Sequence, residues 1–269
     1  MGESKYRSNK ISYIFALAAV VGFAVFFAYN LYDSFLYWCD GRQAQRNSEI
    51  VQNIFAEHIN EIAEFIAAGQ EGSLPDFNEG SYLLARTRQA TGSANIVAYI
   101  AIPGTNIGNA IVQTADNEHY LYHDIFGNAN VNGALFMDFR NAPDFSNPNT
   151  IIYGHNMRNG TMFHDLRHFM QRDFFARHPF IFIVAEHEVL VYEIFSAFST
   201  AIDFDYIQVF FNHPQEFANL LDEITSRRVY NTGISVNRYD NILILSTCTN
   251  AREDTRFVVA GRLAKRIGR

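Results

Sequence analysis

Three places in the chain carry side chains that together suit acyl transfer. Segment 151–157 (IIYGHNM) is a hydrophobic run that passes through a glycine into His155, and segment 242–249 (ILILSTCT) is a second such run that reaches Cys248. A third stretch, RFVV, begins at Arg256. A thiolate is a strong nucleophile, an imidazole carries protons near neutral pH, and a guanidinium donates directed hydrogen bonds to a carbonyl or an oxyanion. These groups are the minimum set for acyl transfer through a thioester.

Each residue also has an ordinary structural explanation when it is taken alone. A cysteine after a hydrophobic strand is usually a small buried side chain, and a histidine or an arginine at a strand end is usually a loop residue or a solvated end. The functional interpretation depends on their meeting in space. If the last two strands form a hairpin around the polar loop 249–255, Cys248 and Arg256 face each other across its open end.

Composition limits the class of protein that can hold these groups. The 269 residues are 48% hydrophobic and 18% charged, which is enough apolar material for a packed core and excludes a disordered chain. A formal net charge of -7 argues against a nucleic-acid partner, which requires a broad basic face. Two cysteines cannot form a disulfide-dense framework. Cys39 is either an acylated or dimerising thiol or, as we favour, a free cysteine beside the membrane.

A long uncharged run near the N-terminus predicts a membrane anchor. Residues 11–32 contain no charged side chain, and about 20 apolar residues span the hydrocarbon core of a bilayer. Lys5, Arg7 and Lys10 precede the run and Asp33 follows it, so the positive-inside rule places the N-terminus in the cytoplasm. Aromatic residues gather at the outer end: Tyr29, Tyr32, Tyr37 and Trp38. A cleaved signal peptide is the alternative, but no clear small-x-small cleavage site follows. We therefore expect a single-pass protein of the cell membrane with an extracellular catalytic domain.

The rest of the chain divides into a helical extension and a strand-rich domain. Apolar residues recur at close to a 3.6-residue spacing over 40–70, which predicts a helix, and a shorter helix is expected over 81–89. From residue 94, short β-rich runs are separated by Gly, Asn, Asp and Pro. The expected organisation is a cytoplasmic tail, a transmembrane signal-anchor, an N-terminal helical extension and a β-barrel catalytic domain, at residues 1–10, 11–32, 33–93 and 94–269.

The strand-rich part predicts a mainly β fold. Its eight candidate strands are 96–102, 111–113, 134–138, 150–153, 180–185, 188–199, 241–247 and 256–263. This number of strands favours a closed antiparallel barrel or a sandwich. An apolar stripe predicts a helix over 213–227, just before the strand that ends at Cys248, and a shorter helix is expected over 161–169.

The motifs around these groups resemble those of a known family. YGHNM at 153–157, LSTCT at 245–249 and RFVVAGR at 256–262 are similar to the three signatures of sortases, specifically of class B. Further similarity lies in IPGTNI at 102–107, IVQ at 111–113, DNEHYL at 116–121 and GALFMDFRN at 133–141. The resemblance covers 96–263 together with the anchor and the extension. It implies an eight-stranded sortase-type β-barrel with N-terminal helices and a helix before the nucleophile strand.

The resemblance implies a cysteine transpeptidase that needs no cofactor. Cys248 would attack the carbonyl after the threonine of a sorting signal, His155 would protonate the leaving amine and later take a proton from the incoming amine, and Arg256 would hold the substrate and its oxyanion. Ser246 and Thr247 either orient the substrate or the arginine or are ordinary strand-end hydroxyls. The implied partners are surface proteins with a C-terminal sorting signal and an amine of peptidoglycan or of its lipid-linked precursor.

The surroundings of the three groups add limits. Position 250 is Asn rather than the acidic residue of some relatives, so no acidic partner for the histidine is supplied there, and Glu253 and Asp254 are interpreted as solvated. His164 and His168 lie four residues apart but lack the Glu of a His-Glu-x-x-His zinc pattern. The aspartates do not follow a calcium-loop spacing. We therefore predict no metal site.

Two other functions stay open at this level. The first is a thiol protease on the same barrel, because a protease and a transpeptidase form the same acyl-enzyme and differ only in the acceptor. The second is a non-catalytic surface-binding barrel in which the cysteine is incidental. The presence of all three motifs argues against the second function.

Overall fold

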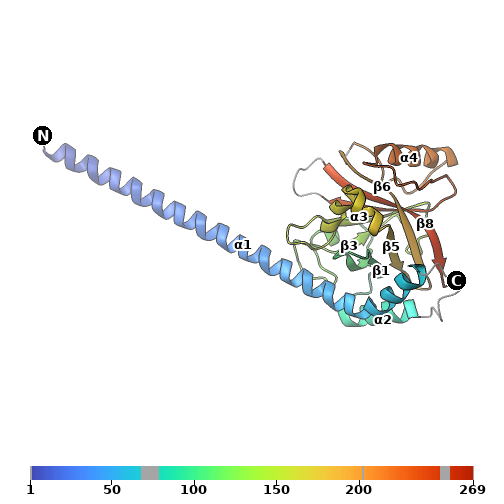
Figure 1. The fold of residues 1–269 in the computed structure, drawn as a ribbon. Coiled ribbons are helices and arrows are strands. Elements are labelled where there is room, and N and C mark those ends of the chain that lie inside the picture. Colours follow the sequence, from blue (N-terminus) through green and yellow to red (C-terminus); the bar gives the residue numbers. More distant parts are fainter. Residues whose placement is uncertain (1, 68–78, 202, 249–254, 269) are drawn as a thin grey trace. The chain divides into compact units, whose positions relative to one another are not determined.

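The computed structural model describes residues 2–67, 79–201, 203–248 and 255–268; within these ranges the side chains of 2–14, 63, 65–67, 79 and 248 are not described. The chain divides into two compact units, Met1–Arg42 and Gln43–Arg269. Figure 1 shows the first as a helix and the second as a barrel with helices around it.

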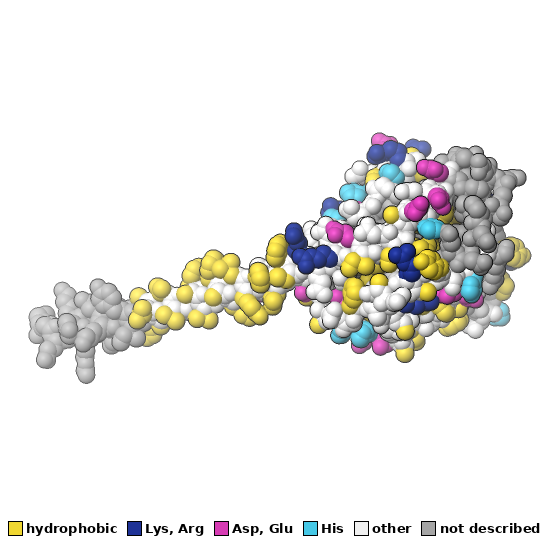
Figure 2. All heavy atoms as spheres, turned by 90° about the horizontal axis from the view of Figure 1, so that it is seen from below, with side chains coloured by type: hydrophobic (Ala, Val, Ile, Leu, Met, Phe, Trp, Pro, Cys, Tyr) yellow, Lys and Arg dark blue, Asp and Glu magenta, His cyan; other side chains and the backbone are white. Residues whose placement is uncertain are grey.

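The first unit is part of one uninterrupted helix, α1 (Gly2–Ala67). Among the described residues, one helix is long and apolar enough to cross a membrane, over Phe15–Ile62, and its best window has a mean hydropathy of 1.9. The side chains of 15–38 are all exposed, and Figure 2 shows hydrophobic side chains covering this part of the helix. The predicted anchor therefore lies in a helix whose length and composition suit a bilayer.

The second unit begins with the end of α1 and with α2 (Glu79–Thr91). Both helices predicted in the extension are thus present. Phe55 and Ile62 of α1 belong to one buried cluster with Leu83 and Leu84 of α2. The Phe55 ring stacks on the ring of Tyr99 in the first strand, with 4.0 Å between the centroids. These contacts bury the apolar face of the extension against the barrel.

The barrel is built from eight strands. They are β1 (Ile96–Ala101), β2 (Gly108–Val112), β3 (Leu135–Met137), β4 (Asn149–His155), β5 (Phe180–Val184), β6 (Val189–Ala201), β7 (Ile242–Cys248) and β8 (Thr255–Ile267). The strands close in the order β1-β2-β3-β4-β7-β8-β6-β5. This closure confirms the predicted barrel and rules out the sandwich.

The expectation that all neighbours are antiparallel is wrong. β2 pairs with β3 and β4 pairs with β7 in parallel. Parallel neighbours need long connections, which here run through 113–134 and 156–241. β4 is buried along nearly its whole length, as parallel strands usually are. A continuous hydrophobic run identifies such a strand but does not reveal the direction of its neighbour.

Four further helices lie in the connections: the 3-10 helices η1 (His119–Leu121) and η2 (His164–Met170), and the α-helices α3 (Arg172–Arg177) and α4 (Pro214–Arg227). α4 confirms the predicted helix, and its buried stripe joins a cluster with residues of β6, β7 and β8. The helix expected over 161–169 begins only at His164 and is a 3-10 helix. α4 therefore packs behind the strands that carry Cys248 and Arg256.

Candidate active site

The parallel pair β4 and β7 brings two of the predicted residues to the same end of the barrel. The register runs without a break from Asn149 opposite Ile242 to His155 opposite Cys248. Residues 156–241 separate the two strands along the chain, so only the pairing of the strands makes these positions neighbours. The side chain of Cys248 lies outside the described residues.

The environment of His155 assigns different roles to its two ring nitrogens. The residue is 6% exposed, and its Nε2 lies 2.9 Å from the carbonyl oxygen of Leu121. A carbonyl oxygen only accepts hydrogen bonds, so Nε2 must carry a proton in either charge state. The buried Nδ1 has no hydrogen-bond partner among the described residues. Nδ1 is therefore the nitrogen that can exchange a proton with a reacting group.

The antiparallel pair β7 and β8 brings the third residue to this end. The register pairs Ile242 with Arg262 and continues to Ser246 opposite Val258; extended by two residues, it sets Cys248 opposite Arg256. This agrees with the predicted hairpin, although its loop 249–254 lies outside the described residues.

Thr247, immediately before Cys248, links β7 to β8 through its side chain. Its hydroxyl accepts a hydrogen bond from the Phe257 N–H at 3.0 Å and donates one to the Phe257 carbonyl at 3.2 Å. Thr247 is 1% exposed. Its hydroxyl therefore holds β7 against β8 next to the predicted nucleophile, and this contact was not foreseen from the sequence.

A groove of about 410 Å³ lies beside these strand ends. Its walls are formed by Asn117, Leu121, Phe136, Tyr153, Phe204, Asp205, Tyr206, Ile207, Ser246 and Arg256. Four of these residues are aromatic, so the groove offers apolar surface together with several polar groups. Leu121 also holds the histidine through its carbonyl oxygen, which links the groove to that side chain.

Ser246 contributes to the groove, but its hydroxyl is already engaged. The Ser246 Oγ lies 2.8 Å from the hydroxyl of Tyr206, and Ser246 is 1% exposed. Tyr206 stands in the connection between β6 and α4 and was not predicted as a site residue. Neither its type nor its spacing marks it in the sequence, because the contact joins segments 40 residues apart.

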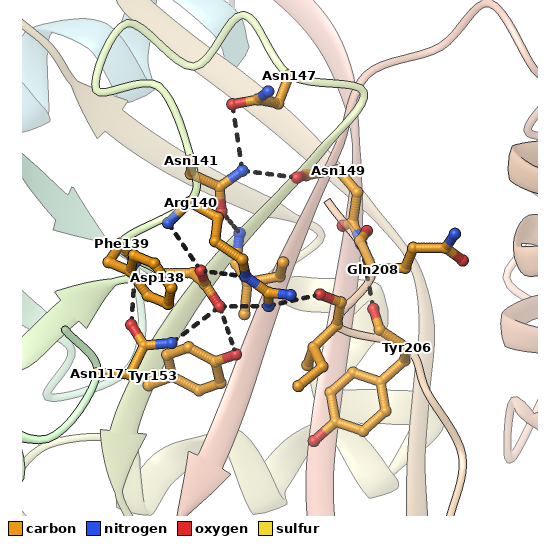
Figure 3. A network of polar contacts seen from close by, with 12 residues as sticks. Asn117, Asp138, Phe139, Arg140, Asn141, Asn147, Asn149, Tyr153, Tyr206 and Gln208 are labelled. Carbon is orange, nitrogen blue, oxygen red and sulfur yellow. Dashed lines mark hydrogen bonds and ion pairs between the residues drawn. The ribbon is translucent and has the colours of Figure 1, made fainter. Parts of the chain in front are cut away.

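A buried carboxylate, that of Asp138, binds two residues that line the groove, Asn117 and Tyr153, and Figure 3 shows these contacts. The Asp138 side chain is 0% exposed, and it accepts hydrogen bonds from Arg140 at 2.7 and 2.8 Å, from the Tyr153 hydroxyl at 2.9 Å and from Asn117 at 3.1 Å. Burial alone would raise the pKa of Asp138, but the hydrogen bonds from Arg140 and Tyr153 outweigh it and hold that pKa below the ordinary value. Burial, followed by the charge of Asp138, raises the pKa of Tyr153. Asp138 is thus ionised and Tyr153 neutral at physiological pH.

Other residues singled out in the sequence lie elsewhere or outside the described chain. Asn250, Glu253 and Asp254 belong to the undescribed loop. His168 lies 3.6 Å from Asp165, and His164 is in the same 3-10 helix. In the described ranges, no three His, Cys, Asp or Glu side chains are grouped so that they could hold a metal ion.

Comparison with known families matches more than half of the chain to a family model. The model of the sortase domain matches residues 100–264. Sortase B of Listeria monocytogenes is 36% identical over 171 residues, which is 63% of this chain and 70% of that protein. Sortase B of Staphylococcus aureus is 33% identical over 173 residues, which is 64% of this chain and 71% of that protein.

Solved structures give the same result for the fold. A Staphylococcus aureus sortase B–substrate complex aligns with a TM-score of 0.69 at 28% identity, covering 83% of this chain and 97% of that one. Sortase B from B. anthracis in complex with AAEK1 aligns with a TM-score of 0.70 at 28% identity, covering 86% and 100%.

Proposed function

Because the chain belongs to the sortase family and, within it, to class B, we propose that it cleaves a sorting signal after threonine through a thioester on Cys248 and transfers the acyl group to a cell-wall amine. The observation that carries this proposal is the common register of β4, β7 and β8. It brings the backbones of His155 and Cys248 opposite each other and, extended, that of Arg256 beside them, at one end of a groove.

The first half of the proposed reaction forms the acyl-enzyme. The Cys248 thiolate attacks the threonine carbonyl carbon, and the oxygen gains negative charge. The guanidinium of Arg256, which lines the groove, donates hydrogen bonds to that oxygen. When the intermediate collapses, the C–N bond breaks and the leaving amine takes the proton from Nδ1 of the His155 imidazolium.

The second half reverses these roles. An incoming primary amine attacks the thioester carbon and gives a proton to Nδ1 of the now neutral His155. The C–S bond then breaks, which returns the thiolate and the imidazolium to their starting states. The hydrogen bond from Nε2 to the Leu121 carbonyl keeps the ring oriented through both halves, so the same nitrogen serves in each.

The helix of the first unit supplies the proposed location. We assign 11–32 as a single-pass anchor with a cytoplasmic N-terminus and an extracellular catalytic domain, because basic residues precede the run and it lies in an exposed apolar helix. The partners that fit this location are surface proteins with a C-terminal sorting signal as acyl donors, and peptidoglycan or its lipid-linked precursor as the amine acceptor.

A product analysis tests the proposal. The full chain in detergent micelles is incubated with a panel of sorting-signal peptides, with and without hydroxylamine or triglycine at high concentration. The expected main product is the amine-linked peptide cut after threonine, with a covalent peptide adduct on Cys248 detectable by mass spectrometry.

Two results would contradict the proposal in different ways. If the free acid is the sole product at every amine concentration, the enzyme is a thiol protease on this barrel. If no peptide is cleaved and no adduct forms while several peptides bind, the barrel is a non-catalytic binding module.

A further inference from the structure

One wall of the groove has no β-ladder to hold it. Residues 206–208 belong to no strand or helix, yet their three successive carbonyl oxygens all accept hydrogen bonds from side chains. Asn149, which is 0% exposed, donates to the carbonyls of Tyr206 at 3.1 Å and Gln208 at 2.9 Å. Arg140 donates to the carbonyl between them, that of Ile207, at 2.9 Å. Tyr206 and Ile207 both line the groove.

The group that orients Arg140 also reaches two other parts of the groove wall. Asp138 binds the Arg140 guanidinium through both of its carboxylate oxygens. The same carboxylate accepts hydrogen bonds from Asn117 and Tyr153, which line the groove from the connection after β2 and from β4. Figure 3 shows these side chains converging on Asp138 and the guanidinium extending toward the 206–208 backbone.

We infer that Asp138 and Arg140 are positioning residues that set the width of the peptide groove. They act through Asn117, Tyr153 and the carbonyl of Ile207 rather than through direct contact with the peptide. This inference rests on the proposed function, since it assigns the groove to the acyl-donor peptide. The planar guanidinium of Arg140 donates hydrogen bonds to the Asp138 carboxylate and to the Ile207 carbonyl at the same time. A lysine ammonium would make these hydrogen bonds with poorer geometry.

A second ion pair on the barrel provides a matched control. Arg88 binds Glu186 at 2.8 Å, and its Nε donates to the carbonyl of Ile96 at 3.0 Å. The two arginine side chains are equally exposed, 31% for Arg88 and 32% for Arg140, but Glu186 is 38% exposed whereas Asp138 is 0% exposed, so the control matches the arginine and not the burial of its partner. Arg88 thus also joins a carboxylate to a backbone carbonyl, but among the described residues it neither lines the groove nor hydrogen-bonds to a residue that does. The melting temperature of each variant therefore reports the loss of its ion pair, and hydrogen exchange at the groove wall reports the loss of the wall.

The experiment compares the full-length parental chain in detergent with Arg140→Gln, Arg140→Lys and Arg88→Gln. The variant Asp138→Asn/Arg140→Gln replaces the ion pair by two neutral amides in case the single change leaves too little folded protein. For each we measure the melting temperature, kcat and KM for a cleaved peptide, and hydrogen exchange of the backbone amides over 203–213. The exchange measurement requires no activity.

We expect Arg140→Gln to raise KM on the order of tenfold, as for loss of a hydrogen bond to a charged group, with kcat nearly unchanged because the wall binds ground and transition states alike. Exchange over 203–213 should accelerate ~threefold or more. Arg140→Lys should give values of KM and exchange rate between those of the parental chain and those of Arg140→Gln. The double variant should resemble Arg140→Gln. Arg88→Gln should change neither KM nor the exchange over 203–213.

Parental KM and parental exchange in folded Arg140→Gln would overturn the inference, as would an equal rise of KM in Arg88→Gln. If the parental chain cleaves no peptide, the proposed function fails. The exchange data would then still decide whether Arg140 positions the wall.

Discussion

The two sides of the groove are held by different forces. On one side, the residues proposed for catalysis stand at the ends of β4, β7 and β8, and the backbone ladders of these strands set their positions. On the other side, segment 206–208 has no ladder, and the side chains of Arg140 and Asn149 hold its carbonyls. A backbone ladder persists through most side-chain changes, whereas a side-chain clamp does not. Backbone pairing therefore positions the residues proposed for catalysis, and side-chain hydrogen bonds position the other wall of the groove.

The largest effect is expected on the ladder side, from removal of the proposed nucleophile. Cys248→Ala should abolish cleavage and thioester capture, because no other group at this position can form the acyl-enzyme. The melting temperature should change little, since a thiol at a strand end contributes little packing. Peptide cleavage and mass spectrometry check both points. Cys39→Ala is the matched thiol control and should retain parental activity; cleavage that survives in Cys248→Ala would mean the nucleophile is misassigned.

A smaller loss is expected from Arg256→Lys, which keeps the charge but not the planar fork. Loss of an oxyanion donor costs roughly 10²–10³-fold in rate, so turnover should fall by about this factor. The ladder of β7 and β8 does not depend on the guanidinium, and the stability should stay near the parental value. Steady-state kinetics together with thermal unfolding test this, and near-parental turnover would show that charge alone is sufficient.

The contact between the two final strands can be weakened without touching a proposed catalytic group. Thr247→Val is nearly isosteric but leaves the N–H and C=O of Phe257 without their hydroxyl partner, which should lower the free energy of unfolding by about 2 kcal/mol. Thr247→Ser retains the hydroxyl and should lose much less. Denaturant unfolding measures the difference. Equal stability of the two variants would show that the hydroxyl does not hold the ladder.

The smallest effect is expected on the side-chain-held wall, from Tyr206→Phe. This change removes the hydroxyl that lies 2.8 Å from Ser246 Oγ and should cost about 1 kcal/mol of stability. Because both residues line the groove, KM should rise a few-fold while kcat stays constant. A fall in kcat with an unchanged KM would instead assign the Tyr206–Ser246 contact to the reaction centre and remove the contrast between the two sides.

Local patterns in the sequence were sufficient to locate most elements. All eight strands lie where short β-rich runs predicted them, and the apolar stripe over 213–227 predicted α4. The pairing of the strands was harder to predict from the sequence. The strand count favoured an antiparallel barrel without naming neighbours, whereas β2–β3 and β4–β7 pair in parallel, because hydrophobic runs report burial and not strand direction.

The same division applies to the site. His155, Cys248 and Arg256 stand out because thiol, imidazole and guanidinium chemistry is readable from residue type at the ends of hydrophobic runs. Asp138 and Tyr206 do not stand out in this way. Asp138 acts through hydrogen bonds to Arg140, Tyr153 and Asn117, and Tyr206 through a contact across 40 residues of chain. The residues that make such contacts are not separated by a regular interval in the sequence, so no periodic pattern predicts them.

By itself the sequence determined the apolar helix near the N-terminus, the strand content of the barrel and the family whose motifs surround His155, Cys248 and Arg256. The helix and the strands follow from composition and from short-range periodicity, and the family follows from the resemblance of its motifs; each segment carries these signals alone. Only the tertiary structure decided that β4 and β7 run in parallel, that Nε2 of His155 binds the Leu121 carbonyl while Nδ1 has no partner among the described residues, and that Arg140 and Asn149 hold the groove wall at 206–208. The physical reason is that hydrogen-bond partners are selected when the barrel closes, which brings together groups far apart along the chain.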